Sequence, residues 1–264
     1  MKALYVDLDG TVLNDGRNES KEVNPKKIYT LAPEYIGTDL GCLDNFYKRS
    51  YMTTTIYDKL QAIKAKGIRL VAVTTRDKYR GFVTLNPQIR DLFDTIYVGN
   101  CLEKYDKGCT DPDYTFRMEV SQPLHVKIGN VRLLLKEVAS TVGVPFVTNY
   151  IKFGCYAYLD IGADLFSDKE VFVKFVSALN ESGISANLAT DGSFLEIYLI
   201  EPKMFTKDIA VAYDIKANNV SYAVCTGDSH HDFEMYKVAN VGIFPEKAIS
   251  PTVSTAEHIE PFGV

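Results

Sequence analysis

Three short apolar segments of the sequence each lead into polar or acidic residues. The segments and the residues that follow them are residues 3–6 before Asp7, residues 70–73 of a predicted strand over 69–73 before Thr74, and residues 222–225 before Gly227 and Asp228. Short, continuous apolar runs are typical of strands that are buried on both faces in a parallel sheet. Because the carboxyl ends of parallel strands form the ligand crevice of such a sheet, the polar residues at these points are candidates for a functional site.

The chain between these strands carries helical patterns. Ile56, Leu60 and Ile63 recur at helical spacing, and Gly67 lies where a helix would end. The other elements predicted in these flanking parts are strands over 95–98 and 241–244 and helices over 207–215 and 233–238. The order of strand, helix and strand predicts an α/β fold with a Rossmann-like parallel-sheet core.

The pattern changes between residues 99 and 203. The elements expected there are a loop over 104–112, helices over 131–142 and 168–181, and strands over 153–161 and 195–199. Apolar and polar residues alternate in the two strands, which indicates an antiparallel sheet covered on one face. We therefore expect a core formed by residues 1–98 and 204–264, interrupted by an inserted α/β cap domain over residues 99–203. The chain of 264 residues is long enough for both parts, at about 150 residues per domain.

The composition excludes several classes of protein. With 46% hydrophobic and 24% charged residues, the chain is unlike disordered proteins, which lack the apolar side chains of a core. A formal net charge of −5 and the absence of a basic run argue against a nucleic-acid partner. We expect no membrane segment and no signal peptide, because no apolar stretch approaches about 18 residues and the N-terminal segment reaches Asp7 early. Five cysteines without a CxxC pair favour a reducing compartment, so we expect a cytoplasmic protein.

Two acidic pairs follow two of the predicted strands: Asp7 with Asp9, and Asp228 with Asp232. Taken alone, an acid at a strand end is more often a helix cap or part of a solvated loop. Four carboxylates at one edge of a sheet repel one another unless a cation lies among them. Since carboxylate oxygens suit Mg²⁺, the two pairs together predict a magnesium site.

Four segments resemble the sequence motifs of the haloacid dehalogenase-like (HAD) hydrolase superfamily. Asp7-Leu-Asp-Gly-Thr-Val-Leu13 is similar to the first motif, and Thr74-Thr75-Arg76 is similar to the second, a Thr or Ser at the end of the second strand. Lys207 lies where the lysine of the third motif belongs, and Gly227-Asp-Ser-His-His-Asp-Phe-Glu-Met235 resembles the fourth. The motifs occur in the order of the family, and the insertion has the position of the cap in its Cof-type, or sugar-phosphatase, branch.

The resemblance implies a role for each matching residue. Asp7 would be the nucleophile that forms an aspartyl-phosphate, and Asp9 would protonate the leaving oxygen and later activate water. Mg²⁺ would be held by Asp7, the backbone carbonyl of Asp9, and Asp228, with Asp232 orienting a water ligand. The residues implied in binding the phosphoryl group or the rest of the substrate are Thr74, Thr75, Arg76, Lys207 and His231.

The implied function is that of a Mg²⁺-dependent phosphatase acting on a small phosphorylated metabolite, with a sugar phosphate as the expected class. The cap would close over the site, exclude water from the first step and select the rest of the substrate, with Tyr156, Tyr158 and Glu196 as candidate contacts. Two alternatives remain open. A phosphomutase would use the same aspartyl-phosphate but return the phosphoryl group to a sugar, and a binding or regulatory protein would keep the fold without turnover. The oligomeric state is left open.

The sequence departs from the family pattern in two places. His231 occupies a position where the family usually has Asn, which still allows a hydrogen bond to substrate but makes its charge depend on pH near neutrality. The pair His230-His231 could also bind a transition metal, although adjacent side chains usually diverge and the carboxylates prefer a hard cation. The stretch 14–52 is longer than the link that the family usually has between the first motif and the following helix. It is expected to form either a surface loop or an extended flap, with residues 28–52 expected to be irregular.

Overall fold

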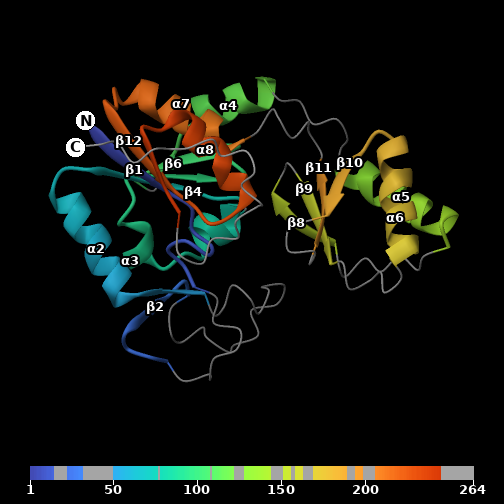
Figure 1. The fold of residues 1–264 in the computed structure, drawn as a ribbon, viewed down its shortest axis with the longest axis horizontal. Helices are drawn as coiled ribbons and strands as arrows, with labels where there is room; N and C mark the ends of the chain where they lie inside the picture. The colour runs from blue at the N-terminus through green and yellow to red at the C-terminus, as the bar shows by residue number, and fades with distance from the viewer. Residues whose placement is uncertain are drawn as a thin grey trace. The chain divides into compact units, whose positions relative to one another are not determined.

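The computed structural model describes residues 1–14, 23–31, 50–76, 78–107, 109–121, 128–143, 151–155, 158–162, 169–188, 194–198 and 206–244. The chain divides into two compact units (Figure 1). Unit 1 is formed by Met1–Asp111 together with Thr206–Val264, and unit 2 by Pro112–Phe205.

Unit 1 is built on a seven-stranded sheet with the strand order β13-β12-β1-β4-β5-β6-β7. The strands of this sheet are β1 (Lys2–Val6), β4 (Arg69–Val73), β5 (Thr95–Val98), β6 (Glu103–Asp106), β7 (Cys109–Thr110), β12 (Tyr222–Thr226) and β13 (Val241–Ile243). The strands from β13 to β5 are parallel, whereas β6 and β7 are antiparallel to their neighbours. The predicted α/β fold with a Rossmann-like parallel-sheet core is therefore confirmed.

Helices cover both faces of this sheet. α2 (Thr54–Ala65) and α3 (Pro87–Arg90) lie on one face, and α7 (Lys207–Ala217) and α8 (Phe233–Val238) lie on the other (Figure 1). The strand order reverses direction at β1, since the chain moves from β1 to β4 on one side and later returns to β12 on the other. In open α/β sheets, ligands bind beyond the carboxyl end of the strand at such a switch point.

Residues 99–111 differ from the sequence prediction, which placed the start of the insertion at residue 99 and a loop over 104–112. Gly99, Asn100 and Cys101 have φ angles of 62°, 54° and 69°, so the chain reverses directly after β5. β6 then pairs with β5 in antiparallel fashion and extends the sheet of unit 1. The loop prediction was wrong. The sequence of β6 is rich in charged residues, which is typical of a loop, but Glu103 and Lys104 are buried in the sheet.

The stretch 14–52 also contains regular structure at its ends. β2 (Lys27–Tyr29) and β3 (Tyr51–Thr53) pair as an antiparallel ribbon. The rings of Tyr29 and Tyr51 lie 5.8 Å apart, and the Lys27 ammonium lies 4.0 Å from the centre of the Tyr51 ring. The prediction of irregular structure over 28–52 was therefore wrong at both ends of that range, while its middle, residues 32–49, lies outside the described residues.

Unit 2 contains a four-stranded antiparallel sheet in the order β10-β11-β9-β8. Its elements are the helices α4 (Pro112–Ser121), α5 (Ile128–Thr141) and α6 (Lys169–Glu181) and the strands β8 (Ile151–Cys155), β9 (Tyr158–Gly162), β10 (Ser185–Leu188) and β11 (Phe194–Tyr198). Residues of α5, α6, β10 and β11 share one apolar core, in which Phe175 and Leu179 are fully buried. The single strand predicted over 153–161 is two paired strands. Within the described ranges, no helix is long and apolar enough to cross a membrane.

Candidate active site

The carboxyl end of β1 brings acidic residues from two parts of the chain together. Asp7 directly follows β1, and its backbone N–H donates to the Thr226 carbonyl at 2.9 Å, which continues the pairing of β1 with β12. Asp228 follows two residues after that carbonyl, and Asp232 begins α8 as its N-cap residue. Carboxylate oxygens of Asp7, Asp228 and Asp232 lie within 4.8 Å of one another. We refer to these three residues as the acidic cluster.

Neighbouring hydrogen bonds fix the carboxylates of the acidic cluster. Asp232 is completely buried, and its Oδ2 accepts hydrogen bonds from the N–H and the hydroxyl of Ser229 at 2.9 and 2.8 Å. Asp228 Oδ1 accepts a hydrogen bond from the Thr11 hydroxyl at 3.3 Å. Gly10 has a φ of +76°, and a Cβ on it would lie 1.9 Å from Asp228 Oδ2, so only glycine allows this approach. Gly10, Thr11 and Ser229 lie inside the motifs of the sequence, but no role was predicted for them.

Lys207 contributes one cation to the acidic cluster. It is the first residue of α7 and its side chain is 1% exposed. Its Nζ donates to Asp7 Oδ1 at 2.6 Å and to Asp232 Oδ1 at 2.5 Å. A buried ammonium between two buried carboxylates gives each charge a partner and a hydrogen bond, which burial of ions requires.

Burial controls the protonation of these groups. It raises the pKa of the Asp7 carboxyl well above its usual range, against the opposing charge of Lys207 and with added repulsion from Asp232 and Asp9. Burial and then the charge of Asp232 raise the pKa of Asp228. Burial alone would lower the pKa of Lys207, but the Asp232 and Asp7 carboxylates raise it above its usual value, so Lys207 remains a cation.

The donor set of the acidic cluster fits a divalent cation. When ionised, the three carboxylates and the Lys207 ammonium carry a formal charge of −2. A doubly charged cation balances that charge, and Mg²⁺ prefers hard carboxylate oxygens of this kind. No histidine joins the potential ligand group among the residues that the structure describes. Of the His230-His231 pair, His231 is half-buried in the short helix His230–Asp232.

Asp9 forms a separate ion pair next to the acidic cluster. The guanidinium of Arg76 holds both of its carboxylate oxygens, with Nε 2.7 Å from Oδ2 and Nη2 2.5 Å from Oδ1. The Arg76 side chain is 1% exposed, whereas that of Asp9 is 35% exposed. The carboxylate of Asp9 is therefore paired with Arg76, and a contact from its backbone carbonyl to a metal stays a prediction. Arg76 was predicted to lie in the site, but its pairing with Asp9 was not predicted.

The end of β4 supplies the remaining predicted site residues of unit 1. β1 pairs with β4 so that Val6 lies beside Ala72, which brings Thr74 out at the same sheet edge as Asp7. Thr74 is buried, and its hydroxyl oxygen accepts a hydrogen bond from the Arg76 N–H at 3.1 Å. Its hydroxyl proton can therefore still be donated.

The other predicted substrate contacts are less fully described. Thr75, between Thr74 and Arg76, is half-buried. Tyr156 lies outside the described residues, whereas Tyr158 lies in β9 and Glu196 in β11. Their role as substrate contacts stays a prediction.

The chain has the fold of the HAD-like hydrolases. A haloacid dehalogenase-like hydrolase from Bacteroides thetaiotaomicron is 18% identical and superimposes with a TM-score of 0.57 over 95% of this chain and 90% of that one. The sucrose-phosphatase of Synechocystis sp. PCC6803, solved with sucrose and phosphate, is 14% identical with a TM-score of 0.53, over 94% of this chain and 83% of that one. No protein-family profile and no curated protein sequence matches the chain.

Proposed function

We propose that this chain is a Mg²⁺-dependent phosphatase that hydrolyses a small phosphorylated metabolite through an aspartyl-phosphate. The observation that carries the proposal is the buried arrangement at the switch point of the sheet, where Lys207 lies between Asp7 and Asp232. Asp7 there has an ammonium at 2.6 Å and two more carboxylates close by. A carboxylate nucleophile, a fixed cation and a set of metal ligands are the parts that phosphoryl transfer requires.

The residues of the chain would act in two steps. First, a carboxylate oxygen of Asp7 would attack phosphorus, so that a new O–P bond forms and the bond from phosphorus to the ester oxygen breaks, with Asp9 protonating the departing oxygen. Water would then attack the phosphorus of the aspartyl-phosphate and lose its proton to Asp9, which releases inorganic phosphate and restores Asp7. Lys207 and Thr74 would donate hydrogen bonds to the phosphoryl oxygens. Mg²⁺ bound by the acidic cluster would favour the ionised form of Asp7, whose pKa burial raises, and would neutralise charge between this nucleophile and the anionic phosphate.

Arg76 supports the role of Asp9 in this scheme. A guanidinium that binds both oxygens of a carboxylate fixes its plane as well as its position. An acid–base group with a fixed orientation loses less freedom when it reaches the transition state. We therefore assign Arg76 as a positioning residue for Asp9.

A sugar phosphate is the proposed class of substrate. The fold is shared with a phosphatase whose structure holds sucrose and phosphate, and the net charge of −5 argues against a nucleic-acid substrate. Unit 2, which corresponds to most of the predicted cap, is proposed to determine which metabolite is accepted.

The test is the release of para-nitrophenol from para-nitrophenyl phosphate with Mg²⁺ and with EDTA. We expect turnover only with Mg²⁺, and a loss of at least about a thousandfold in Asp7→Asn. Asp91→Asn is the matched control, because the side chain of Asp91 is 75% exposed at the end of α3. Absence of Mg²⁺-dependent turnover, or equal turnover in Asp7→Asn, would contradict the proposal. A screen of phosphorylated metabolites, with a sugar bisphosphate added to detect transfer to sugar, then separates a phosphatase from a phosphomutase.

A further inference from the structure

Helix α7 carries a second buried charge, two turns beyond the lysine of the acidic cluster. The buried positions of α7 are Lys207, Ala210, Val211 and Asp214. Lys207 and Asp214 are seven residues apart, so they lie on the same face of the helix. Because the two side chains buried between them are small, the polar contacts at Lys207 and Asp214 do much to set where α7 lies on the sheet.

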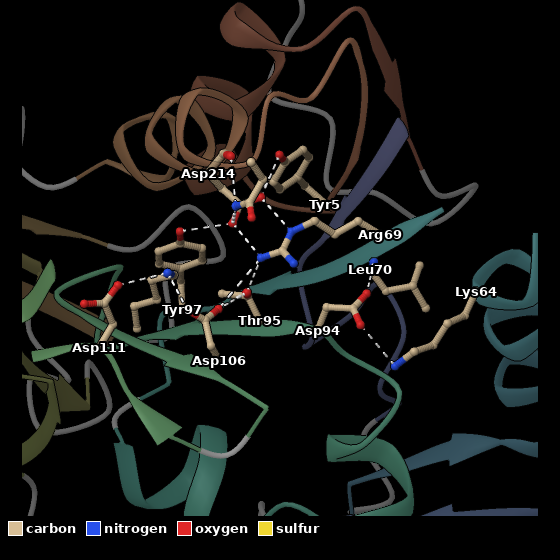
Figure 2. Close-up of polar contacts among 12 residues, drawn as sticks. Tyr5, Lys64, Arg69, Leu70, Asp94, Thr95, Tyr97, Asp106, Asp111 and Asp214 are labelled. Atoms are coloured by element: carbon tan, nitrogen blue, oxygen red, sulfur yellow. Dashed lines mark hydrogen bonds and ion pairs between the residues drawn. The ribbon is translucent and has the colours of Figure 1, made fainter. Parts of the chain in front are cut away.

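Three adjacent strands hold the Asp214 carboxylate. Asp214 is 0% exposed, and it accepts hydrogen bonds from Arg69 of β4, with Nε 3.1 Å from Oδ2 and Nη2 3.0 Å from Oδ1 (Figure 2). The hydroxyl of Tyr5 in β1 donates to Oδ2 at 3.0 Å, and that of Tyr97 in β5 donates to Oδ1 at 3.4 Å. The side-chain amide of Asn218, the C-cap residue of α7, donates a further hydrogen bond to Oδ1 at 3.1 Å. A buried carboxylate with this many donors is fixed in position as well as compensated in charge.

Burial and the neighbouring charges keep the Tyr5 hydroxyl protonated and Arg69 cationic. Burial, followed by the charge of Asp214, raises the pKa of Tyr5, so its hydroxyl remains a donor. Burial alone would lower the pKa of Arg69, but the hydrogen bonds to Asp214 raise it. Arg69 also contacts the Thr95 hydroxyl and lies 3.8 Å from Asp106, which ties it to β5 and β6. Arg69, which binds Asp214, is therefore fixed within the sheet and is not a mobile surface charge.

We propose that the Arg69–Asp214 pair positions Lys207, by setting where the first turn of α7 lies relative to Asp7. The chain at β1 and helix α7 are joined at two points: Tyr5 in β1 binds Asp214, and Asp7, the residue directly after β1, binds Lys207. Attachment at two points restricts both sliding and rotation of the helix. Asp214 is thus a positioning residue that acts through Lys207, and its effect on turnover rests on the proposed function.

Asp94 offers a matched control on the same sheet. Its Oδ2 accepts a hydrogen bond from the Leu70 N–H at 3.0 Å, and its Oδ1 lies 3.5 Å from the Lys64 ammonium (Figure 2). Asp94 therefore also links a helix to β4 through a carboxylate. The helix is α2, which contributes no residue to the proposed site.

The experiment compares Asp214→Asn with Asp94→Asn in two measurements. The first is kcat and KM for para-nitrophenyl phosphate in Mg²⁺, where Asp214→Asn is expected to lower kcat about 10- to 100-fold while KM changes less than about twofold. The second is the rate at which acetic anhydride acetylates Lys207 in EDTA, followed by mass spectrometry on protein that circular dichroism shows to be folded. We expect this rate to rise at least about threefold in Asp214→Asn, because the first turn of α7 opens more often. Asp94→Asn is expected to match the wild type in both.

The outcomes separate the two proposals. Equal effects of the two variants on kcat and on Lys207 acetylation would overturn the positioning role. If Asp214→Asn does not fold, Tyr5→Phe removes one hydroxyl from the same carboxylate and is expected to change both readouts in the same direction, by less. If the wild type has no Mg²⁺-dependent activity, the proposed function fails, and the acetylation rates alone decide whether Asp214 positions Lys207.

Discussion

Replacing Asp228 by asparagine should change stability in opposite directions with and without Mg²⁺ if the acidic cluster is a metal site. The cluster's oxygens lie within 4.8 Å of one another, a distance at which two like charges repel by about 3.5 kcal/mol at an effective dielectric constant of about 20, and by about 1 kcal/mol in water. Asp228 is half-buried, and Lys207 offsets part of the repulsion. Asparagine has the same shape and can still accept the Thr11 hydrogen bond. In EDTA at neutral pH, we therefore expect Asp228→Asn to raise the free energy of unfolding by about 1 kcal/mol.

This gain depends on pH with a definite sign. The pKa of Asp228 is raised in the folded state, chiefly by burial and then by Asp232. Between the ordinary carboxyl pKa of 3.8 and the raised value, the folded state binds more protons than the unfolded state, so wild-type stability falls as pH rises through that window. Asp228→Asn has no carboxyl group at this position, so its stability lacks the part of the decrease with pH that comes from Asp228. The difference between the two proteins should therefore vanish below the ordinary carboxyl pKa and be largest near neutrality.

Addition of Mg²⁺ should reverse the order of stability. At a concentration of about 100 times Kd, a ligand stabilises the folded state by about 2.7 kcal/mol, and a 100-fold loss of affinity reduces this to about 0.4 kcal/mol. The variant should then be about 1 kcal/mol less stable than the wild type. The assay is urea unfolding followed by far-ultraviolet circular dichroism, in EDTA and over a Mg²⁺ titration. Equal stabilisation of both proteins by Mg²⁺, or a variant that is less stable in EDTA, would refute the assignment of a metal site.

Two further substitutions test the geometry around the acidic cluster. Gly10→Ala should lower the free energy of unfolding by about 1 to 3 kcal/mol and weaken stabilisation by Mg²⁺, because the new Cβ displaces Asp228. Gly67→Ala is the control, since Gly67 has a φ of +73° but no atom within 4 Å of the position of a Cβ. In the same urea assay it should cost only the backbone strain and leave the Mg²⁺ effect intact. Arg76→Lys should lower kcat for para-nitrophenyl phosphate about 10- to 100-fold, because lysine cannot hold both oxygens of Asp9. Arg90→Lys, at a partly exposed pair 3.7 Å from Asp91, serves as its control and should retain kcat; equal kcat values in the two arginine variants would remove Arg76 from the mechanism.

The parallel core could be predicted from the sequence because each of its signals is local. An apolar run such as residues 3–6, followed at once by Asp7, identifies both a strand and the edge at which it ends. The same logic fails for β6, in which Glu103 and Lys104 are buried as charged residues. Lys104 is stabilised there by Asp106 at 2.6 Å and by Asp111 at 3.0 Å. A strand whose buried lysine is paired with acids two and seven residues away has the composition of a loop, and only the pairing reveals it.

The polar contacts that organise the site join residues far apart in the sequence, and local pattern cannot predict them. Asp9 and Arg76 are 67 positions apart, and Tyr5 and Asp214 are 209 apart. The residues of the acidic cluster could be found because motifs mark them, whereas Tyr5 lies inside an apolar run and has the appearance of a simple core residue. Side chains alternate between the faces of a strand, so the neighbours of Tyr5 pack into the apolar core on the α2 side while its hydroxyl points toward α7. The side chains on one face of β1 meet a buried carboxylate only because α7 covers that face. The contact of Tyr5 with Asp214, which we propose to position Lys207, therefore follows from the topology of the sheet and not from any motif.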